Sequence, residues 1–222
     1  MPKMRAEKVV LPFLTKSKRR MQHSSEKETM TISDAQRDVR TIFRGGFAGQ
    51  LVSSSIWFAS ASLATWYSTK AGIVMLIVGG FFIFPLTQLL LRAMGGPSSL
   101  PKGHPMTALG MQIAFIVPFN LPLVGAAAIH HLSWFYPACM IVVGTHYLPF
   151  IFLYGMRQFG ALAGILISAG LLIGLYLPSA TFSFGGWLTA VTLLAFAFLE
   201  RRTALKERAD LAASPRQPLV PD

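Results

Sequence analysis

A histidine stands inside a long apolar segment, in the sequence VGTHYLPF at residues 143–150. Pro149 lacks an N–H, and its ring crowds the carbonyl group four residues earlier, which belongs to Thr145. The pattern predicts a kinked helix with the Thr145 carbonyl free beside the imidazole of His146. Polar groups cost several kcal/mol each in hydrocarbon unless they are satisfied, so we expect both to face protein or a wet cavity.

Asn120 is the first candidate partner of this histidine. It lies between Pro118 and Pro122 in the sequence VPFNLP, so its own helix is also expected to have a loosened backbone. If the two helices run in opposite directions, Asn120 and His146 come within about 6 Å of each other in depth, at roughly 1.5 Å per residue. Side chains can bridge that distance.

A second layer of polar residues is expected in the inner halves of the preceding segments. It consists of Gln50, Gln88 and Gln112. Pro85 lies close to Gln88 and repeats the proline kink. Together with His146 and Asn120, these residues predict a polar pocket near the membrane midplane, between broken helices, as transporters build. The alternative is that they only form hydrogen bonds that pack the helices together.

The composition predicts where these residues lie. Of the 222 residues, 53% are hydrophobic and 13% are charged, which is half of the roughly 25% charged residues in a soluble domain. No acidic residue occurs between Asp38 and Glu200. A stretch of that length cannot cover a soluble surface, but it can face lipid. The sequence therefore predicts an all-α, polytopic integral membrane protein.

Six apolar segments each have about the 20 residues that are needed to cross the core of a bilayer. The breaks between them are short, and most of them carry turn residues. The transmembrane domain is therefore expected to cover residues 47–199. The predicted spans are residues 47–66, 71–92, 106–129, 134–156, 158–177 and 183–199.

The distribution of basic residues predicts the orientation of the spans. With both termini in the cytoplasm, all but one of the 20 Lys and Arg residues lie on the inner side, and Lys70 alone lies outside. This asymmetry is the positive-inside pattern. Several Trp and Tyr residues also fall at predicted outer ends. We therefore expect a cell membrane protein, in a bacterial inner membrane, with both ends inside.

A short amphipathic helix is predicted over residues 33–46, before the first span. Ser33 and Gln36 have the spacing of a capping box. Apolar residues fall on one face of this helix. The opposite face carries Arg37, Arg40 and Arg44. We expect this helix to lie on the inner membrane surface with its guanidinium groups toward anionic lipid phosphates; the alternative is a solvated charged segment.

The two ends of the chain are expected to be basic, disordered extensions, over residues 1–32 and 200–222. Met30 is an alternative start of the native protein, because the ordered sequence is predicted to begin just after it. The net charge of +11 resides mainly in these ends. Its position beside spanning helices favours anionic lipid as the partner and argues against nucleic acid.

The fifth span carries two GxxxG spacings, in the sequence GALAGILISAGLLIG. Small residues at this spacing let helix backbones approach closely. We expect them to pack within the bundle, because every span has neighbours in its own chain; a dimer interface is the alternative. The four glycines are Gly160, Gly164, Gly170 and Gly174.

Several kinds of chemistry have no support in the sequence. It has neither a GxSxG nucleophile elbow nor a GxxxxGK[ST] phosphate loop. Cys139 is the single cysteine, and His130 and His131 have no acidic neighbour, so we expect no metal site. No predicted span contains Asp or Glu, which argues against a carboxylate proton relay. We therefore expect no enzyme activity and no cofactor.

Three segments resemble an uncharacterised, domain-of-unknown-function family of small bacterial polytopic inner-membrane proteins. They are GGFAGQLVSSSIWF at 45–58, HPMTALGMQIAFIVPFNLPLVGAA at 104–127 and WFYPACMIVVGTHYLPFIFLYGM at 134–156. The resemblance covers about residues 30–200 and implies a bacterial membrane protein. It carries no established catalytic or binding residues, so it assigns no function to any position.

The leading functional hypothesis is a small permease or channel-like protein, with His146, Asn120 and Gln112 around a central pocket. The alternative is a non-catalytic membrane scaffold or assembly protein, in which the polar residues only pack helices. The substrate and the oligomeric state do not follow from the sequence.

The predicted topology can be tested by cysteine labelling. In a background without Cys139, we expect Lys70→Cys and Arg92→Cys to react with an impermeant thiol reagent from opposite sides of the membrane, because the second span separates them. Labelling of both positions from one side would contradict the topology.

Overall fold

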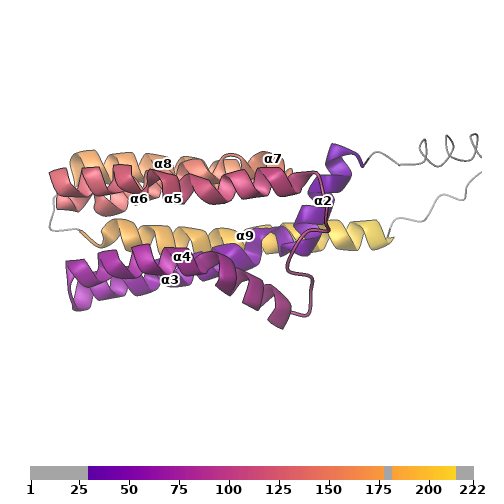
Figure 1. Ribbon diagram of the computed structural model, residues 1–222, viewed down its shortest axis with the longest axis horizontal. Helices are drawn as coiled ribbons and strands as arrows, with labels where there is room; N and C mark the ends of the chain where they lie inside the picture. Colours follow the sequence, from indigo (N-terminus) through magenta and orange to yellow (C-terminus); the bar gives the residue numbers. More distant parts are fainter. Residues whose placement is uncertain (1–29, 178–181, 214–222) are drawn as a thin grey trace, which may run out of the picture. The chain divides into compact units, whose positions relative to one another are not determined.

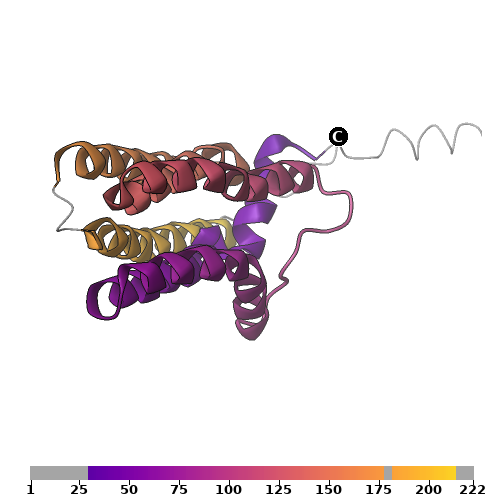
Figure 2. The ribbon, with the colours of Figure 1, turned by 60° about the vertical axis from the view of Figure 1, so that its left-hand side comes forward.

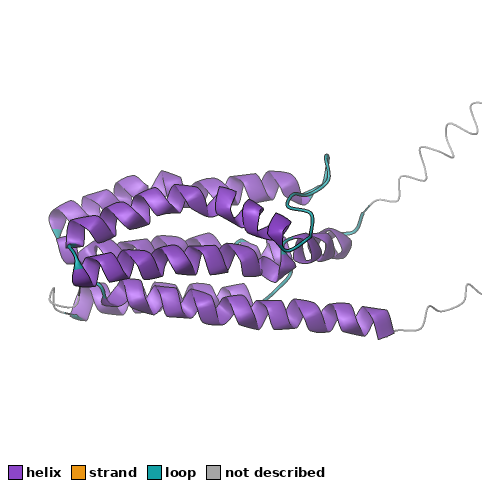
Figure 3. Cartoon of the chain, turned by 90° about the horizontal axis from the view of Figure 1, so that it is seen from below, coloured by secondary structure: helices purple, strands orange, loops and turns teal. Residues whose placement is uncertain are grey.

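The computed structural model describes residues 30–177 and 182–213. All regular structure in these residues is helical (Figure 3). The described residues fall into two units, which divide between Asp34 and Ala35. The elements in chain order are α2 (Ile32–Ile42), η1 (Arg44–Gly46), α3 (Phe47–Trp66), α4 (Thr69–Ala93), α5 (Met106–His130), η2 (Leu132–Trp134), α6 (Phe135–Tyr147), α7 (Phe150–Tyr154), α8 (Gln158–Tyr176) and α9 (Phe184–Ala213).

The first unit contributes the start of α2, and the residues that cap it differ from those we predicted. The Thr31 hydroxyl donates to a carboxylate oxygen of Asp34 at 2.6 Å and accepts from the Asp34 backbone N–H at 3.2 Å. The second bond is that of an N-cap side chain, and in the first the carboxylate accepts from the Thr31 hydroxyl instead of the backbone N–H that a capping box uses. The helix therefore begins before Ser33, which lies within its first turn. Of the predicted extension, residues 1–29 lie outside the described residues.

In the second unit the long helices form two groups (Figures 1 and 2). In one, α3 packs against α4 and α9; in the other, α6 packs against α8 and α5. Contacts of α9 with α8 and α6 join the groups. The connections between α3 and α4, between α5 and α6 and between α7 and α8 are short, so the helices that they join run in opposite directions.

Glycines allow the helices of each group to approach closely. A Cβ at Gly72 of α4 would lie 2.5 Å from the Cβ of Ala64 on α3. A Cβ at Gly144 of α6 would lie 3.1 Å from the carbonyl oxygen of Ala163 on α8. Lipid provides no hydrophobic driving force between helices, so close packing of this kind is what holds them together.

Five helical segments are long and apolar enough to cross a membrane. They fit a membrane protein, and they correspond to the second to sixth predicted spans. The first predicted span coincides with α3, which has 20 residues but contains Gln50 and five serines and is not among the five. A sixth span therefore stays a prediction. The five segments are Thr69–Ala93, Met106–His130, Leu132–Tyr154, Gln158–Tyr176 and Phe184–Glu207.

Two of the predicted spans differ in detail. The segment 134–156 is broken, because α6 ends at Tyr147 and α7 begins at Phe150, with Pro149 between them. The last helix does not end at residue 199 but runs to Ala213. Residues 200–213, which we expected in a disordered tail, therefore extend α9; residues 214–222 lie outside the described residues.

The glycines of α8 have different surroundings, although their spacing is regular. A Cβ at Gly170 would lie 2.8 Å from the carbonyl oxygen of Pro137, and one at Gly174 would lie 3.2 Å from the Pro137 ring. A Cβ at Gly160 would lie 3.0 Å from the Ile151 side chain, whereas a Cβ at Gly164 would have no neighbouring atom within 4 Å. The second GxxxG pair thus faces α6, and only one member of the first pair has a close neighbour.

This difference predicts opposite effects for the same substitution. Gly170→Ala should lower the free energy of unfolding by about 1–3 kcal/mol, because the new methyl group meets backbone that must move. Gly164→Ala is the matched control and should raise stability by up to about 1 kcal/mol through helix propensity. Thermal unfolding of the purified protein in detergent measures both, and equal effects would refute the packing.

Candidate functional site

His146 lies at the contact of α6 with α5 and is partly buried. Its ring lies beside the backbone of Ile113 on α5. Its Nδ1 atom is buried and has no hydrogen-bond partner among the described residues. The rings of Tyr147 and Phe150 lie beside it, with centroids 5.6 and 5.0 Å away. The imidazole thus keeps one unused polar atom in an apolar setting.

The other members of the predicted pocket do not hydrogen-bond to His146. The Asn120 amide donates to the Ile116 carbonyl of its own helix at 2.7 Å. Gln112 is exposed on the surface of α5, and Gln88 is half-buried on α4. The structure therefore places these amides on different helix surfaces, and it brings only His146 into contact with a neighbouring helix backbone.

The proline break is satisfied locally. The carbonyl of Thr145 accepts a hydrogen bond from the Leu148 N–H at 3.2 Å, and the Thr145 hydroxyl donates to Val142 at 2.8 Å. The carbonyl that Pro149 leaves without its usual partner is therefore not free beside His146, as the sequence suggested. Tightening of the last turn toward 3₁₀ geometry supplies the missing donor.

A buried acidic residue is the polar feature that sequence reasoning missed. Glu200 of α9 is 0% exposed, and Gln50 of α3, which is 2% exposed, faces it. Neither carboxylate oxygen of Glu200 and neither amide atom of Gln50 has a partner within hydrogen-bond geometry among the described residues. Glu200 lies within the candidate span Phe184–Glu207, one residue beyond the point where we expected the last span to end.

The backbone at Arg44–Gly46 allows the chain to approach this carboxyl group. All three residues have positive φ angles, 52°, 70° and 92°, and glycine adopts this region at little cost. A Cβ at Gly45 would lie 3.0 Å from the Glu200 carbonyl oxygen, and one at Gly46 would lie 3.3 Å from Glu200 Oε2. The Gly-Gly pair before α3 was the sequence signal that could have indicated this approach.

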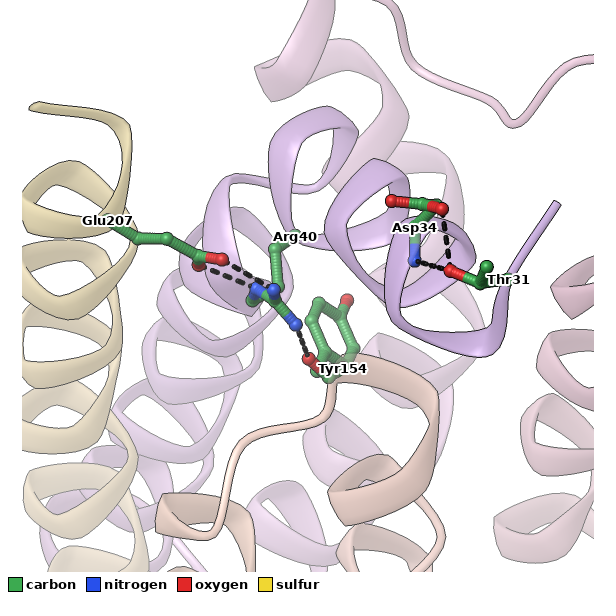
Figure 4. A network of polar contacts seen from close by, with 5 residues as sticks. All are labelled: Thr31, Asp34, Arg40, Tyr154 and Glu207. Carbon is green, nitrogen blue, oxygen red and sulfur yellow. Dashed lines mark hydrogen bonds and ion pairs between the residues drawn. The ribbon is translucent and has the colours of Figure 1, made fainter. Parts of the chain in front are cut away.

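The arginines of α2 and η1 bind protein groups. The Arg40 guanidinium donates to both carboxylate oxygens of Glu207, at 2.7 and 2.6 Å, and to the Tyr154 carbonyl at 2.5 Å (Figure 4). Arg44 donates to the Met94 carbonyl at 2.6 Å. Arg37 is exposed. Two of the three residues that we assigned to lipid phosphates therefore tie α2 and η1 to other helices.

The histidines that follow α5 form an aromatic cluster. The rings of His130 and His131 lie 4.6 Å apart, and both lie near Trp134. In residues 30–177 and 182–213, no three His, Cys, Asp or Glu side chains are grouped so that they could hold a metal ion.

The chain was compared with known proteins. The model of a family of unknown function, DUF7010, matches residues 32–202. No curated protein and no solved structure matches the chain. The family carries no assigned chemistry, so the arrangement of the residues themselves is the basis for a functional argument.

The Arg40–Glu207 pair predicts a measurable stabilisation. Arg40→Met should lower the free energy of unfolding by about 1–3 kcal/mol, because it removes a two-pronged ion pair and a bond to the Tyr154 carbonyl, and Glu207 is partly exposed. Arg92→Met is the matched control, since Arg92 is exposed and makes one 3.2 Å bond to Ser98. Thermal unfolding in detergent should separate the two variants; indistinguishable melting curves would contradict the role of Arg40.

Proposed function

Because this chain belongs to the family of unknown function DUF7010, we propose a function from its own residues. The proposal is a small multi-pass permease or channel-like protein that carries an ion or a small solute across the bilayer. The observation that carries it is a set of buried polar atoms without hydrogen-bond partners among the described residues. They belong to Gln50, Thr87, His104, His146, Gln158 and Glu200.

Such atoms are costly in a protein that lies in lipid. An unsatisfied polar group in hydrocarbon costs several kcal/mol, and ionisable groups there usually mark a substrate or ion pathway. Water or a bound solute would satisfy these groups. His146 is the group we assign to the solute, because its Nδ1 is buried and unused. Asn120 and Gln112 belong to the same proposal as further polar groups on α5.

The topology that goes with this proposal has six spans and both termini in the cytoplasm of a bacterial inner membrane. The distribution of basic residues supports the orientation. The packing of α3 against α4 and α9, both of which contain candidate spans, supports its insertion with them. On α2, Ala35 and Val39 are buried while Arg37 is exposed, which fits a helix at the membrane surface beside anionic lipids.

A membrane scaffold is the second candidate, and a different observation favours it. Several polar side chains form hydrogen bonds between helices. Ser54 of α3 donates to the Ala190 carbonyl of α9 at 2.8 Å, and Ser60 bonds to both the Gly72 carbonyl and the Tyr136 hydroxyl. These residues act as packing contacts. A scaffold needs only such hydrogen bonds between helices. A permease also needs buried polar groups that are free to bind its solute.

Liposome swelling tests the permease proposal with defined probes: potassium chloride, sodium chloride and glycerol. Purified protein should raise the flux of one of them above that of empty liposomes. His146→Ala should lower this flux about fivefold, if one hydrogen bond of roughly 1 kcal/mol to the solute is lost, and should leave membrane insertion unchanged. His130→Ala, an exposed histidine, is the matched control and should retain full flux.

Two outcomes would reject the permease. One is flux equal to that of empty liposomes for every probe while the protein remains folded. The other is equal flux in His146→Ala and the wild type. Either result would favour the scaffold.

A further inference from the structure

We propose that Glu200 is a proton-binding site, at which the side-chain carboxyl group takes up and releases one hydrogen ion inside the helix bundle. The site itself is argued from geometry. The role of the site rests on the proposed function: in a permease, the hydrogen ion bound at Glu200 would be the ion that is transported or that drives transport.

Burial without a positive partner is the first argument. Glu200 is 0% exposed, and neither of its oxygens has a partner within hydrogen-bond geometry or in an ion pair among the described residues, although the Gln50 amide lies beside it. A buried carboxylate that lacks a counter-ion costs several kcal/mol, while the neutral acid costs far less. The folded bundle therefore favours a Glu200 that carries a bound cation, of which the smallest is a proton.

The nearby arginines are occupied elsewhere. Arg201 lies over the ring of Phe47, with its guanidinium carbon 4.6 Å from the ring centroid. Arg40 binds Glu207, and Arg44 binds the Met94 carbonyl. Neutralisation of Glu200 by Arg40, Arg44 or Arg201 would require one of these contacts to break.

The groups that face Glu200 from other helices are neutral. Gln50 faces it from α3, and Tyr147 of α6 and Tyr154 of α7 are the titratable side chains close enough to interact with it electrostatically. Both tyrosines are buried. The ring of Phe159 on α8 lies 3.0 Å from the position of a Cβ on Gly46 and closes the same side. The setting is therefore an apolar pocket with one amide as its polar neighbour.

A divalent metal ion fits this setting poorly. Mg²⁺ and Ca²⁺ take six or more oxygen ligands. Here the carboxylate offers two oxygens and the Gln50 amide offers one. No group of three metal-binding side chains occurs in the part of the chain that the structure describes. A proton needs only one of the carboxylate oxygens, and the amide of Gln50 can then bond to the neutral acid.

The Arg44–Gly46 turn gives the proton a route to the carboxyl group. It is non-helical backbone beside Glu200 Oε2, and Gly45 and Gly46 are buried in protein there. Arg44 is the non-glycine residue of the turn with a positive φ angle, and such residues concentrate at binding sites and switch regions. Movement of this turn would expose one carboxylate oxygen without unfolding α9.

Infrared spectroscopy of the purified protein tests the site. At neutral pH the wild type should show the carbonyl stretching band of a protonated carboxyl group, and the band should disappear at alkaline pH as the proton leaves. Glu200→Gln should lose this band at neutral pH. Glu207→Gln is the matched control and should retain it, because Glu207 is held as a carboxylate by Arg40.

Gln50→Leu provides a second variant in case Glu200→Gln fails to fold. It keeps the carboxyl group and removes its polar neighbour, so the band should persist and shift to higher frequency. A wild-type protein without the band at neutral pH would overturn the proposal. So would a band that survives in folded Glu200→Gln, or one that sodium chloride abolishes while choline chloride does not, since the last result indicates a metal cation.

Proton flux into liposomes that contain a pH-sensitive dye, driven by a potassium diffusion potential, separates the site from the proposed function. Wild type and Glu207→Gln should show flux, and Glu200→Gln should lose it. A Glu200-dependent band without flux of protons or of the swelling probes supports the site and rejects the permease. Solute flux without that band supports the permease and overturns the site.

Discussion

In this chain, the helices must satisfy their own polar groups, because a bilayer has no water with which to do so. The five apolar segments meet this requirement through regular backbone hydrogen bonds. Where the regularity fails, a local substitute is present: the Thr145 carbonyl takes the Leu148 N–H in place of the donor that Pro149 lacks. Serines complete the pattern by donating to carbonyls of their own or neighbouring helices. Most polar groups of the helices are thus hydrogen-bonded, and the buried atoms without a partner, such as those of Glu200 and His146, are exceptions.

Close packing by small residues follows from the same environment. The approach of α3 to α4 at Gly72, and of α6 to α8 at Gly144 and Gly170, leaves no room for a methyl group. Such contacts replace the hydrophobic effect, which contributes little between helices in lipid. Gly45 and Gly46 likewise allow a turn to pack against Glu200. The close packing and the candidate binding site therefore involve the same residues.

The sequence was a good guide to what depends on local composition and a poor guide to what depends on distant contacts. Apolar runs and the proline at 149 predicted the helices and the break in the third candidate span, because both are local effects. The burial of Glu200 depends on Gly45, which is 155 positions away in the chain, so the acid was assigned to the start of the C-terminal tail. Arg40 was assigned to lipid for a similar reason, since its partner Glu207 lies 167 residues away. Asn120 and Gln112 share a helix, but their surroundings depend on packing that periodicity does not specify.

The length of α9 couples two regions that the sequence keeps separate. One unbroken helix of 30 residues carries both Glu200 and Glu207, seven residues or about 10 Å apart along its axis. Because both residues belong to one continuous helix, a movement of α9 at Glu200 also moves Glu207. If α9 tilts or slides to let water reach Glu200, the Arg40–Glu207 ion pair near the end of the helix must lengthen or break. Exposure of the buried acid is then coupled to an ion pair at the bundle surface.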